Sequence, residues 1–135
     1  MKSPILHWIL RLVPAVLLFQ TLFFKFTASE ESVYIFTQLG VEPWGRIVSG
    51  IIELIAAILI VIPSRTALGA LAGVSVMAGA VLSHLTVLGI EIMGDGGLLF
   101  ILALVILVCC TVLVLLNKSQ LAKVTIIGKT LNGKQ

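Results

Sequence analysis

The chain has 135 residues and a formal net charge of +3; 59% of its residues are hydrophobic, only 11% are charged, and its mean hydropathy is +1.20. Soluble domains average about 45–50% apolar and about 25% charged residues, so this composition excludes a water-soluble globule and predicts an integral membrane protein in a lipid bilayer. The sequence has no groove-entering motif or aromatic platform, so we also exclude nucleic acid as a partner.

Four apolar runs, each near the ~20 residues needed to cross the hydrocarbon core, predict four transmembrane helices. We place them at about 5–26, 45–62, 67–88 and 98–116, in one all-α bundle that uses the whole chain. The first run could instead be a signal peptide that begins with Lys2. However, Arg11 interrupts the run and Phe26-Thr27-Ala28 is a poor cleavage site, so the sequence favours a retained helix.

The charges of the connections predict the orientation. Basic residues fall at the N-terminus, at Arg65 and in the tail 117–135, whereas acidic residues fall in the other two connections. Because short loops rich in Lys and Arg stay in the cytoplasm, both termini should be cytoplasmic. We expect a multi-pass protein of a bacterial inner membrane, whose basic tail lies on the anionic inner leaflet.

In the first predicted helix, Arg11, Leu18 and Lys25 lie at seven-residue intervals and therefore share a face at ~100° per residue. Gln20 lies at a depth similar to that of Lys25, but on a different face. We expect Arg11 to extend toward the inner headgroups, because long basic side chains do so near helix ends. The loop that follows interleaves aromatic and polar residues around Tyr34, which predicts a short segment along the interface.

Glu53 lies near the middle of the second apolar run. A charge at that depth costs roughly 2.5–3.5 kcal/mol unless it is paired or protonated, so Glu53 should face the interior and have a partner. Lys25, Arg46 and His84 are the candidate partners. Five residues of this run share one face at spacings of four, three, four and three, and the small ones, Gly50 and Ala57, permit a close approach of another helix. The five are Arg46, Gly50, Glu53, Ala57 and Ile60.

The third and fourth predicted helices differ in composition. Gly69 and Gly73 form a G-x-x-x-G pattern, and Ser75, Gly79 and Ser83 continue small residues at four-residue spacing. Such ridges bring helix backbones together in lipid, so we expect the third helix to be the most enclosed. The fourth run is almost wholly aliphatic, and we expect it to be the most lipid-exposed.

Cys109 and Cys110 invite a redox interpretation. Adjacent cysteines in a helix point about 100° apart, so a disulfide between them would be strained. A metal site would need clustered ligands, and His7 and His84 belong to other segments. The sequence therefore favours apolar packing residues, and it predicts no metal site and no catalytic residue.

The polar residues of the outer half of the bundle allow two interpretations. In one, Glu53 pairs with Lys25, Arg46 or His84 only to fix the helix register. In the other, these four residues and Gln20 bind a proton, a quinone head group or another small ligand. Ionisable residues within the membrane are functional candidates by default, and the residues alone do not choose between the two.

The chain resembles the DoxX-like branch of the DoxX superfamily of small four-helix membrane proteins over about residues 8 to 110. The resemblance rests on a series of short motifs in a fixed order. They are Arg11-Leu-Val-Pro-Ala, Gln20 through Lys25-Phe26, Phe36-x-x-Leu-Gly40, Pro43-Trp44, Gly50-Ile-Ile-Glu53-Leu and Gly79-Ala80-x-x-Ser-His84.

The resemblance implies a four-helix bundle with both ends in the cytoplasm, and a single domain over residues 1–135. It does not choose a function, because relatives include a subunit of a thiosulfate:quinone oxidoreductase, a partner in a membrane complex against oxidative stress, and membrane chaperones. Two hypotheses follow: an accessory or scaffold subunit, or a quinone-linked redox component with a membrane or soluble redox partner. The sequence has no cofactor ligands and no poised dithiol, which favours the accessory subunit over an enzyme.

Overall fold

A computed structural model describes residues 4–123 of the chain. Its elements, in chain order, are α1 (Pro4–Phe26), α2 (Glu30–Gln38), α3 (Trp44–Val61), α4 (Thr66–Ser83), the π-helical turn η1 (His84–Leu88) and α5 (Leu98–Leu116). The four spans α1, α3, α4 with η1, and α5 are long and apolar enough to cross a membrane. The predicted all-α fold class is therefore confirmed. The tail beyond residue 123, which we expect on the inner leaflet, lies outside the described residues.

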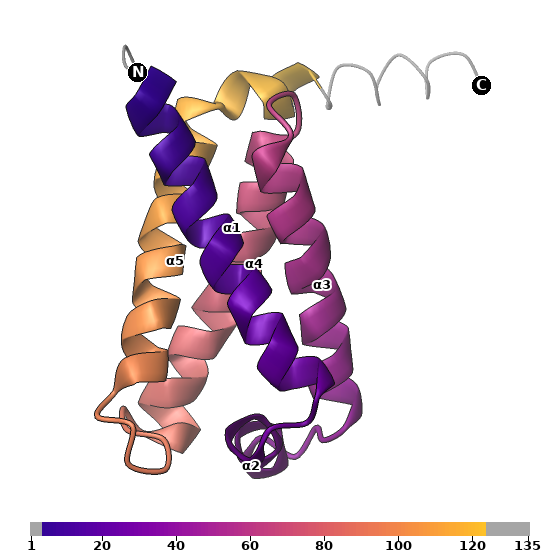
Figure 1. The fold of residues 1–135 in the computed structure, drawn as a ribbon, viewed down its shortest axis with the longest axis vertical. Helices are drawn as coiled ribbons and strands as arrows, with labels where there is room; N and C mark the ends of the chain where they lie inside the picture. The colour runs from indigo at the N-terminus through magenta and orange to yellow at the C-terminus, as the bar shows by residue number, and fades with distance from the viewer. Residues whose placement is uncertain (1–3, 124–135) are drawn as a thin grey trace, which may run out of the picture.

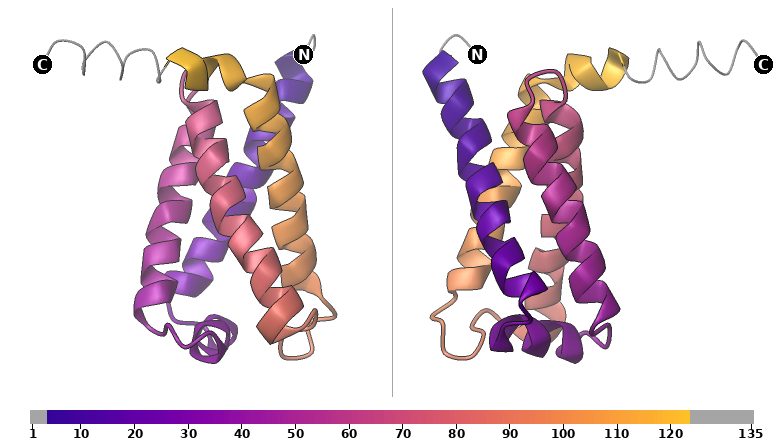
Figure 2. Two further views of the ribbon diagram at one scale, coloured as in Figure 1. Left: turned by 180° about the vertical axis from the view of Figure 1, so that it is seen from behind. Right: turned by 45° about the vertical axis from the view of Figure 1, so that its right-hand side comes forward.

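The four spans form a bundle in which each packs against two neighbours (Figure 1). α1 packs against α3 and α5, and α4 packs against the same two helices from the other side. The start of α1 and the end of α5 lie at one end of the bundle, which we call the terminal end. The short helix α2 and the 89–97 loop lie at the opposite end, the loop end, as the views in Figure 2 confirm.

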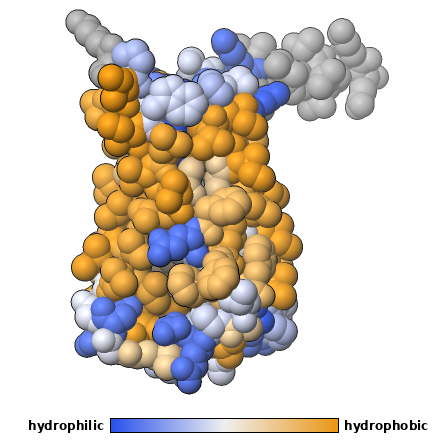
Figure 3. All heavy atoms as spheres, in the orientation of Figure 1, coloured by the Kyte–Doolittle hydropathy of each residue, from blue (hydrophilic) through white to orange (hydrophobic). Residues whose placement is uncertain are grey.

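The outer surface of the bundle suits a bilayer. Figure 3 shows a broad hydrophobic belt between two more hydrophilic ends. Inside, the sequence places small and aliphatic residues on the faces that meet. The residues at the centre that are almost completely buried include Leu18, Ala56, Ile60, Ala70, Ile106 and Leu113. This core orients the polar side chains of α1 and α3 toward each other.

The face predicted for the second helix is confirmed in α3. Its members Arg46, Gly50, Glu53, Ala57 and Ile60 are all buried. A Cβ atom added at Gly50 would lie 2.9 Å from the ring of Phe26, so the glycine permits the end of α1 to approach α3. This approach brings the polar residues near the end of α1 to the level of Glu53.

The predicted burial of the other two spans is wrong. The most buried span is α3, with 39% of its most apolar 18-residue window buried, and the least buried is Thr66–Leu88, with 17%. The α5 window, at 22%, is therefore not the most exposed. The row of small residues on α4, from Gly69 to Ser83, makes close contact with neighbouring helices over only part of its length.

The contacts of the glycines explain this difference. A Cβ atom at Gly69 would lie 2.7 Å from the Ile60 backbone N of α3, and one at Gly73 would lie 2.7 Å from Cys110 Sγ of α5. At Gly79 an added Cβ atom would meet nothing within 4 Å. The hydroxyl of Ser83 is exposed and donates to its own helix at Gly79 O, 2.8 Å away. α4 is therefore tightly packed near the terminal end and open to lipid beyond it.

Candidate functional site

An ion pair joins α1 to α3 in the half of the bundle nearer the loop end. Lys25 Nζ donates to Glu53 Oε1, and the Glu53 side chain is 1% exposed while that of Lys25 is 15% exposed. The Thr21 hydroxyl lies 3.0 Å from Glu53 Oε2 and 2.7 Å from Leu18 O. The inference that Glu53 faces the interior with a partner is confirmed, and the partner is Lys25.

Arg46, a candidate partner of Glu53, pairs with a different carboxylate. Its Nε donates to Glu42 Oε1 at 2.9 Å and Oε2 at 3.1 Å, and its Nη1 donates to Lys25 O. Arg46 lies seven residues before Glu53, which is roughly 10 Å along the helix, whereas Glu42 is one turn away. The proposed Arg46–Glu53 pair is therefore wrong. Arg46 instead ties the start of α3 to the end of α1.

His84 is buried at the start of η1, and no hydrogen bond joins it to Glu53 in the described part of the chain. Its Nδ1 donates a hydrogen bond to Gly89 O at 2.9 Å. Its ring packs edge to face against that of Phe100, with 5.4 Å between the two ring centres. Gly89 has a φ of +80°, a conformation that favours glycine and turns the chain back toward the imidazole. A pairing of His84 with Glu53 is also wrong. The ring Nε2 has no hydrogen-bond partner among residues 4–123.

Lys25 and His84 line one cavity of about 330 Å³, which we call the polar cavity. Its wall comes from α1, α2, α4, η1, the 89–97 loop and α5. The apolar part of the wall includes Met77, Ala103 and Ile106. The polar part of the wall consists of Gln20, Thr21, Lys25, Ser29, Glu31, Ser32, His84 and Asp95. Glu53 itself does not line the cavity, so it acts there through Lys25.

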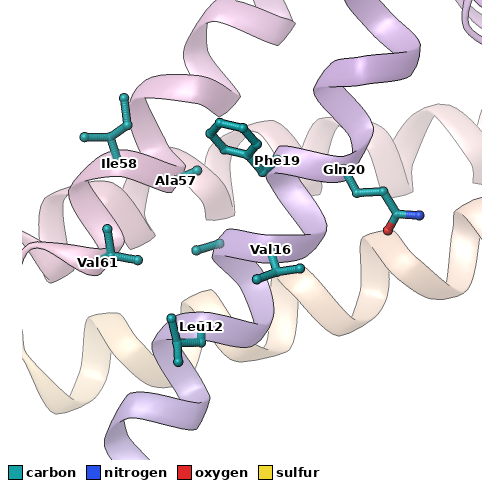
Figure 4. A pocket seen from close by; sticks show the side chains of 8 residues that line it. Leu12, Val16, Phe19, Gln20, Ala57, Ile58 and Val61 are labelled. Carbon is teal, nitrogen blue, oxygen red and sulfur yellow. The ribbon is translucent and has the colours of Figure 1, made fainter.

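Gln20 marks the border between this cavity and a second one. It is exposed, and it also lines an apolar groove of about 490 Å³ between α1 and α3. Figure 4 shows the groove, with Phe19 and Val16 of α1 and Ala57 and Ile58 of α3, and with the Gln20 amide directed away from Ile58. Gln20 is thus separate from the Lys25–Glu53 pair, as its different helix face predicts.

The sequence did not reveal three contributors to this region. Thr21 lies one turn before Lys25, so helical spacing could have indicated it. Ser29 caps α2 by accepting a hydrogen bond from Ser32 N at 3.3 Å. α2 itself fulfils the expectation of a short segment after the first span, and it crosses the loop end of the bundle (Figure 1).

Asp95 is the third contributor, and it organises the loop before α5. Its Oδ1 accepts from Ile92 N at 3.0 Å and Gly97 N at 2.8 Å, and its Oδ2 accepts from Leu99 N at 3.2 Å. Burial raises the pKa of Asp95, but these three donors and nearby His84 lower it by more. The net pKa is therefore below the ordinary value, and Asp95 is ionised at neutral pH. Only the folded loop brings these donors together.

The two cysteines lie outside the polar cavity. Cys110 is buried and packs against Gly73, and Cys109 is half-buried. Cys110 therefore has the packing role that the sequence favours. Within residues 4–123, no group of three His, Cys, Asp or Glu residues is placed to hold a metal ion.

Near the terminal end, the side chain of Arg11 is buried. It is 7% exposed, on the same face as Leu18, and its guanidinium carbon lies 4.9 Å from the centre of the Trp8 ring. The face that Arg11 shares with Leu18 points into the bundle, and the contact with Trp8 lies on the side of the terminal end. The expectation that Arg11 extends toward the headgroups stays a prediction. Nearby, Asn117 Nδ2 lies 3.3 Å from His7 Nε2, which joins α1 to the end of α5.

Comparison with known proteins agrees with this architecture. The model of the DoxX-like family matches residues 9–113, a range that includes α3, α4, most of α1 and α5, and every residue that lines the polar cavity. Searches of curated proteins and of solved structures gave no significant match. Since the match extends over most of the sequence, the chain belongs to the DoxX-like family of membrane proteins.

Proposed function

We propose that this protein is an accessory subunit of a bacterial inner membrane that holds a small amphipathic molecule in the polar cavity. One observation carries the proposal: the Lys25 ammonium lines a cavity and is held there by a buried carboxylate. A pair that served only the helix register would need no cavity beside it. Concave sites with a mostly apolar wall and a few polar groups are typical ligand sites.

The chemistry of the wall indicates the class of ligand. Lys25 donates hydrogen bonds, but Glu53 already balances its charge, so the cavity favours a neutral oxygen acceptor such as a carbonyl or a phenol. Asp95 and the hydroxyls of Ser29 and Thr21 supply acceptors for a hydroxyl group. A volume of about 330 Å³ is at the lower end of the usual range for ligand sites, which suits a head group of one ring.

The second candidate is a quinone-linked redox component, which would work with a membrane or soluble redox protein. It is favoured by the position of His84 beside Lys25 in one wall, because reduction of a quinone to a quinol needs two protons as well as two electrons. The aromatic rings of Phe24 and Phe36 in the same wall suit a planar head group. The electrons would come from the partner.

Purification in a mild detergent, followed by mass spectrometry of small molecules, tests both candidates. We expect the wild type to carry an amphipathic molecule and Glu53→Gln to retain about tenfold less of it, because a charge-assisted contact is lost. Glu30→Gln is the matched control, since Glu30 is exposed at the same end and does not line the cavity. It should retain the wild-type amount.

The identity of the molecule separates the candidates. A quinone that a candidate partner reduces in the presence of the wild type, but not of His84→Gln, would favour the redox component. Any other amphipathic molecule, with no effect on quinone reduction, would favour the accessory subunit. A wild type that carries no small molecule, and whose melting temperature does not respond to added hydroquinones or quinones, would contradict both.

A further inference from the structure

Arg11 is a buried cation that forms no ion pair with any of residues 4–123. Its side chain is 7% exposed, and its Nε is buried with no hydrogen-bond partner among residues 4–123. Its guanidinium carbon lies 4.9 Å from the centre of the Trp8 ring, and the ring face attracts a cation but offers no oxygen acceptor for the Nε donor. Buried charges in proteins are paired or bound to an ion, so Arg11 is an exception that requires a partner.

The chain places its acidic side chains elsewhere. All six lie in the loop-end segments or in the middle of α3: Glu30, Glu31, Glu42, Glu53, Glu91 and Asp95. Two of these carboxylates already form ion pairs near the loop end: Glu53 pairs with Lys25, and Glu42 pairs with Arg46. Arg11 lies roughly 10 Å into α1 from the terminal end, by the helical rise. No acidic side chain of the sequence is therefore placed to neutralise it.

The neutral polar residues around Arg11 are occupied by other contacts. Asn117 Nδ2 donates to Leu113 O at 2.9 Å and lies 3.3 Å from His7 Nε2. Gln120 Oε1 accepts from Ala67 N at 2.9 Å, and its Nε2 donates to Pro63 O at 2.8 Å. These bonds join the terminal ends of α1, α4 and α5, and none of them uses a donor of Arg11. Among residues 4–123, Arg11 therefore keeps a buried Nε donor that nothing accepts from.

We propose that Arg11 is the anchor of an oxyanion site that takes a phosphate group at the terminal end of the bundle. A guanidinium presents parallel N–H donors that match two phosphate oxygens, and it is less strongly hydrated than an ammonium. Exposed Lys118 and Lys123 lie at the same end and raise the local concentration of anions. The phosphate comes from the headgroup of a membrane phospholipid or from free phosphate.

Native mass spectrometry with phosphatidylglycerol, and melting with inorganic phosphate, distinguish the two sources. If a headgroup is bound, the wild type should retain phosphatidylglycerol after delipidation and Arg11→Gln should retain about tenfold less. If free phosphate is bound, inorganic phosphate should raise the melting temperature of the delipidated wild type and not that of Arg11→Gln. Arg65→Gln is the control, because it removes the same charge from an exposed position, and it should behave as the wild type.

Three results would overturn the proposal. In the first, Arg65→Gln loses as much bound lipid or phosphate response as Arg11→Gln, so only general surface charge matters. In the second, the wild type neither retains phosphatidylglycerol nor responds to phosphate. This second result decides the matter even if Arg11→Gln does not fold. In the third, Arg11 is neutralised by a carboxylate of a co-purified protein.

Discussion

The two ends of the bundle differ in whether a buried cation has a carboxylate beside it. At the loop end, Lys25 meets Glu53 and Arg46 meets Glu42, so each buried cation has a carboxylate supplied by the chain itself. At the terminal end, Arg11 is just as buried as Arg46 and has no such carboxylate. A low-dielectric interior makes both kinds of charge expensive. The comparison teaches that the chain supplies a carboxylate to both cations of the loop end, whereas we propose that the counter-ion of Arg11 comes from outside the chain.

The largest expected effect comes from removing the cation of the loop end. Lys25→Met leaves Glu53 buried with the Thr21 hydroxyl but without a counter-charge, and breaking a buried pair costs about 3–5 kcal/mol. The double variant Lys25→Met, Glu53→Leu should recover most of this loss, because an apolar pair of similar size replaces the charges. Unfolding in a detergent titrated with denaturant measures all three proteins.

A matched change at the terminal end sharpens the comparison. Lys118 is exposed, so Lys118→Met should change stability by no more than about 0.5 kcal/mol. Equal losses of unfolding free energy in Lys25→Met and Lys118→Met would mean that the Lys25–Glu53 pair contributes no more to stability than an exposed charge does. A double variant that is as unstable as Lys25→Met would mean that the loss comes from packing and not from the orphaned charge.

The next effect concerns packing, which also differs between the two ends of α4. Gly69→Ala places a Cβ atom 2.7 Å from the Ile60 backbone N, and such overpacking costs about 1–3 kcal/mol. Gly79→Ala meets nothing within 4 Å and should be neutral or stabilising by up to about 1 kcal/mol, because Ala favours a helix over Gly. Thermal melting of the two variants checks the order. The reverse order would contradict the described packing of α4.

The smallest effect concerns the loop that closes the polar cavity. Asp95→Asn keeps the shape of the side chain but weakens its hydrogen bonds from three backbone N–H groups. We expect the free energy of unfolding to fall by about 1 kcal/mol. The folded pKa of Asp95 lies below the unfolded value, so the contribution is full above about pH 4 and is lost as the pH falls through the folded pKa. The stability difference between wild type and variant should therefore be constant near pH 7 and shrink below about pH 4. A difference that is the same at all pH values would contradict this role.

The sequence predicted what depends on hydropathy and helical spacing. The four spans follow from the apolar runs, because the thickness of a bilayer fixes their length. The burial of Glu53 follows from the cost of a charge in lipid, which requires a partner on a facing helix. These inferences need no knowledge of how the helices are rotated against one another.

The details that depend on tertiary packing could not be predicted. Lys25, Arg46 and His84 were equally plausible partners of Glu53 until the rotation of α1 placed Lys25 opposite. The small residues of α4 indicated a close helix contact but not where along the helix it ends. Gln120, which joins the 62–65 turn to the end of α5, has no sequence signal, because its partners are backbone groups more than fifty residues away.

One native mass spectrum of three proteins tests the difference between the two ends most directly. The account predicts that the wild type carries a small amphipathic molecule and a phosphate-bearing adduct. Glu53→Gln should lose the former alone, and Arg11→Gln should lose the latter alone. If both variants retain the full wild-type set of bound molecules, neither end is a binding site and the account is wrong.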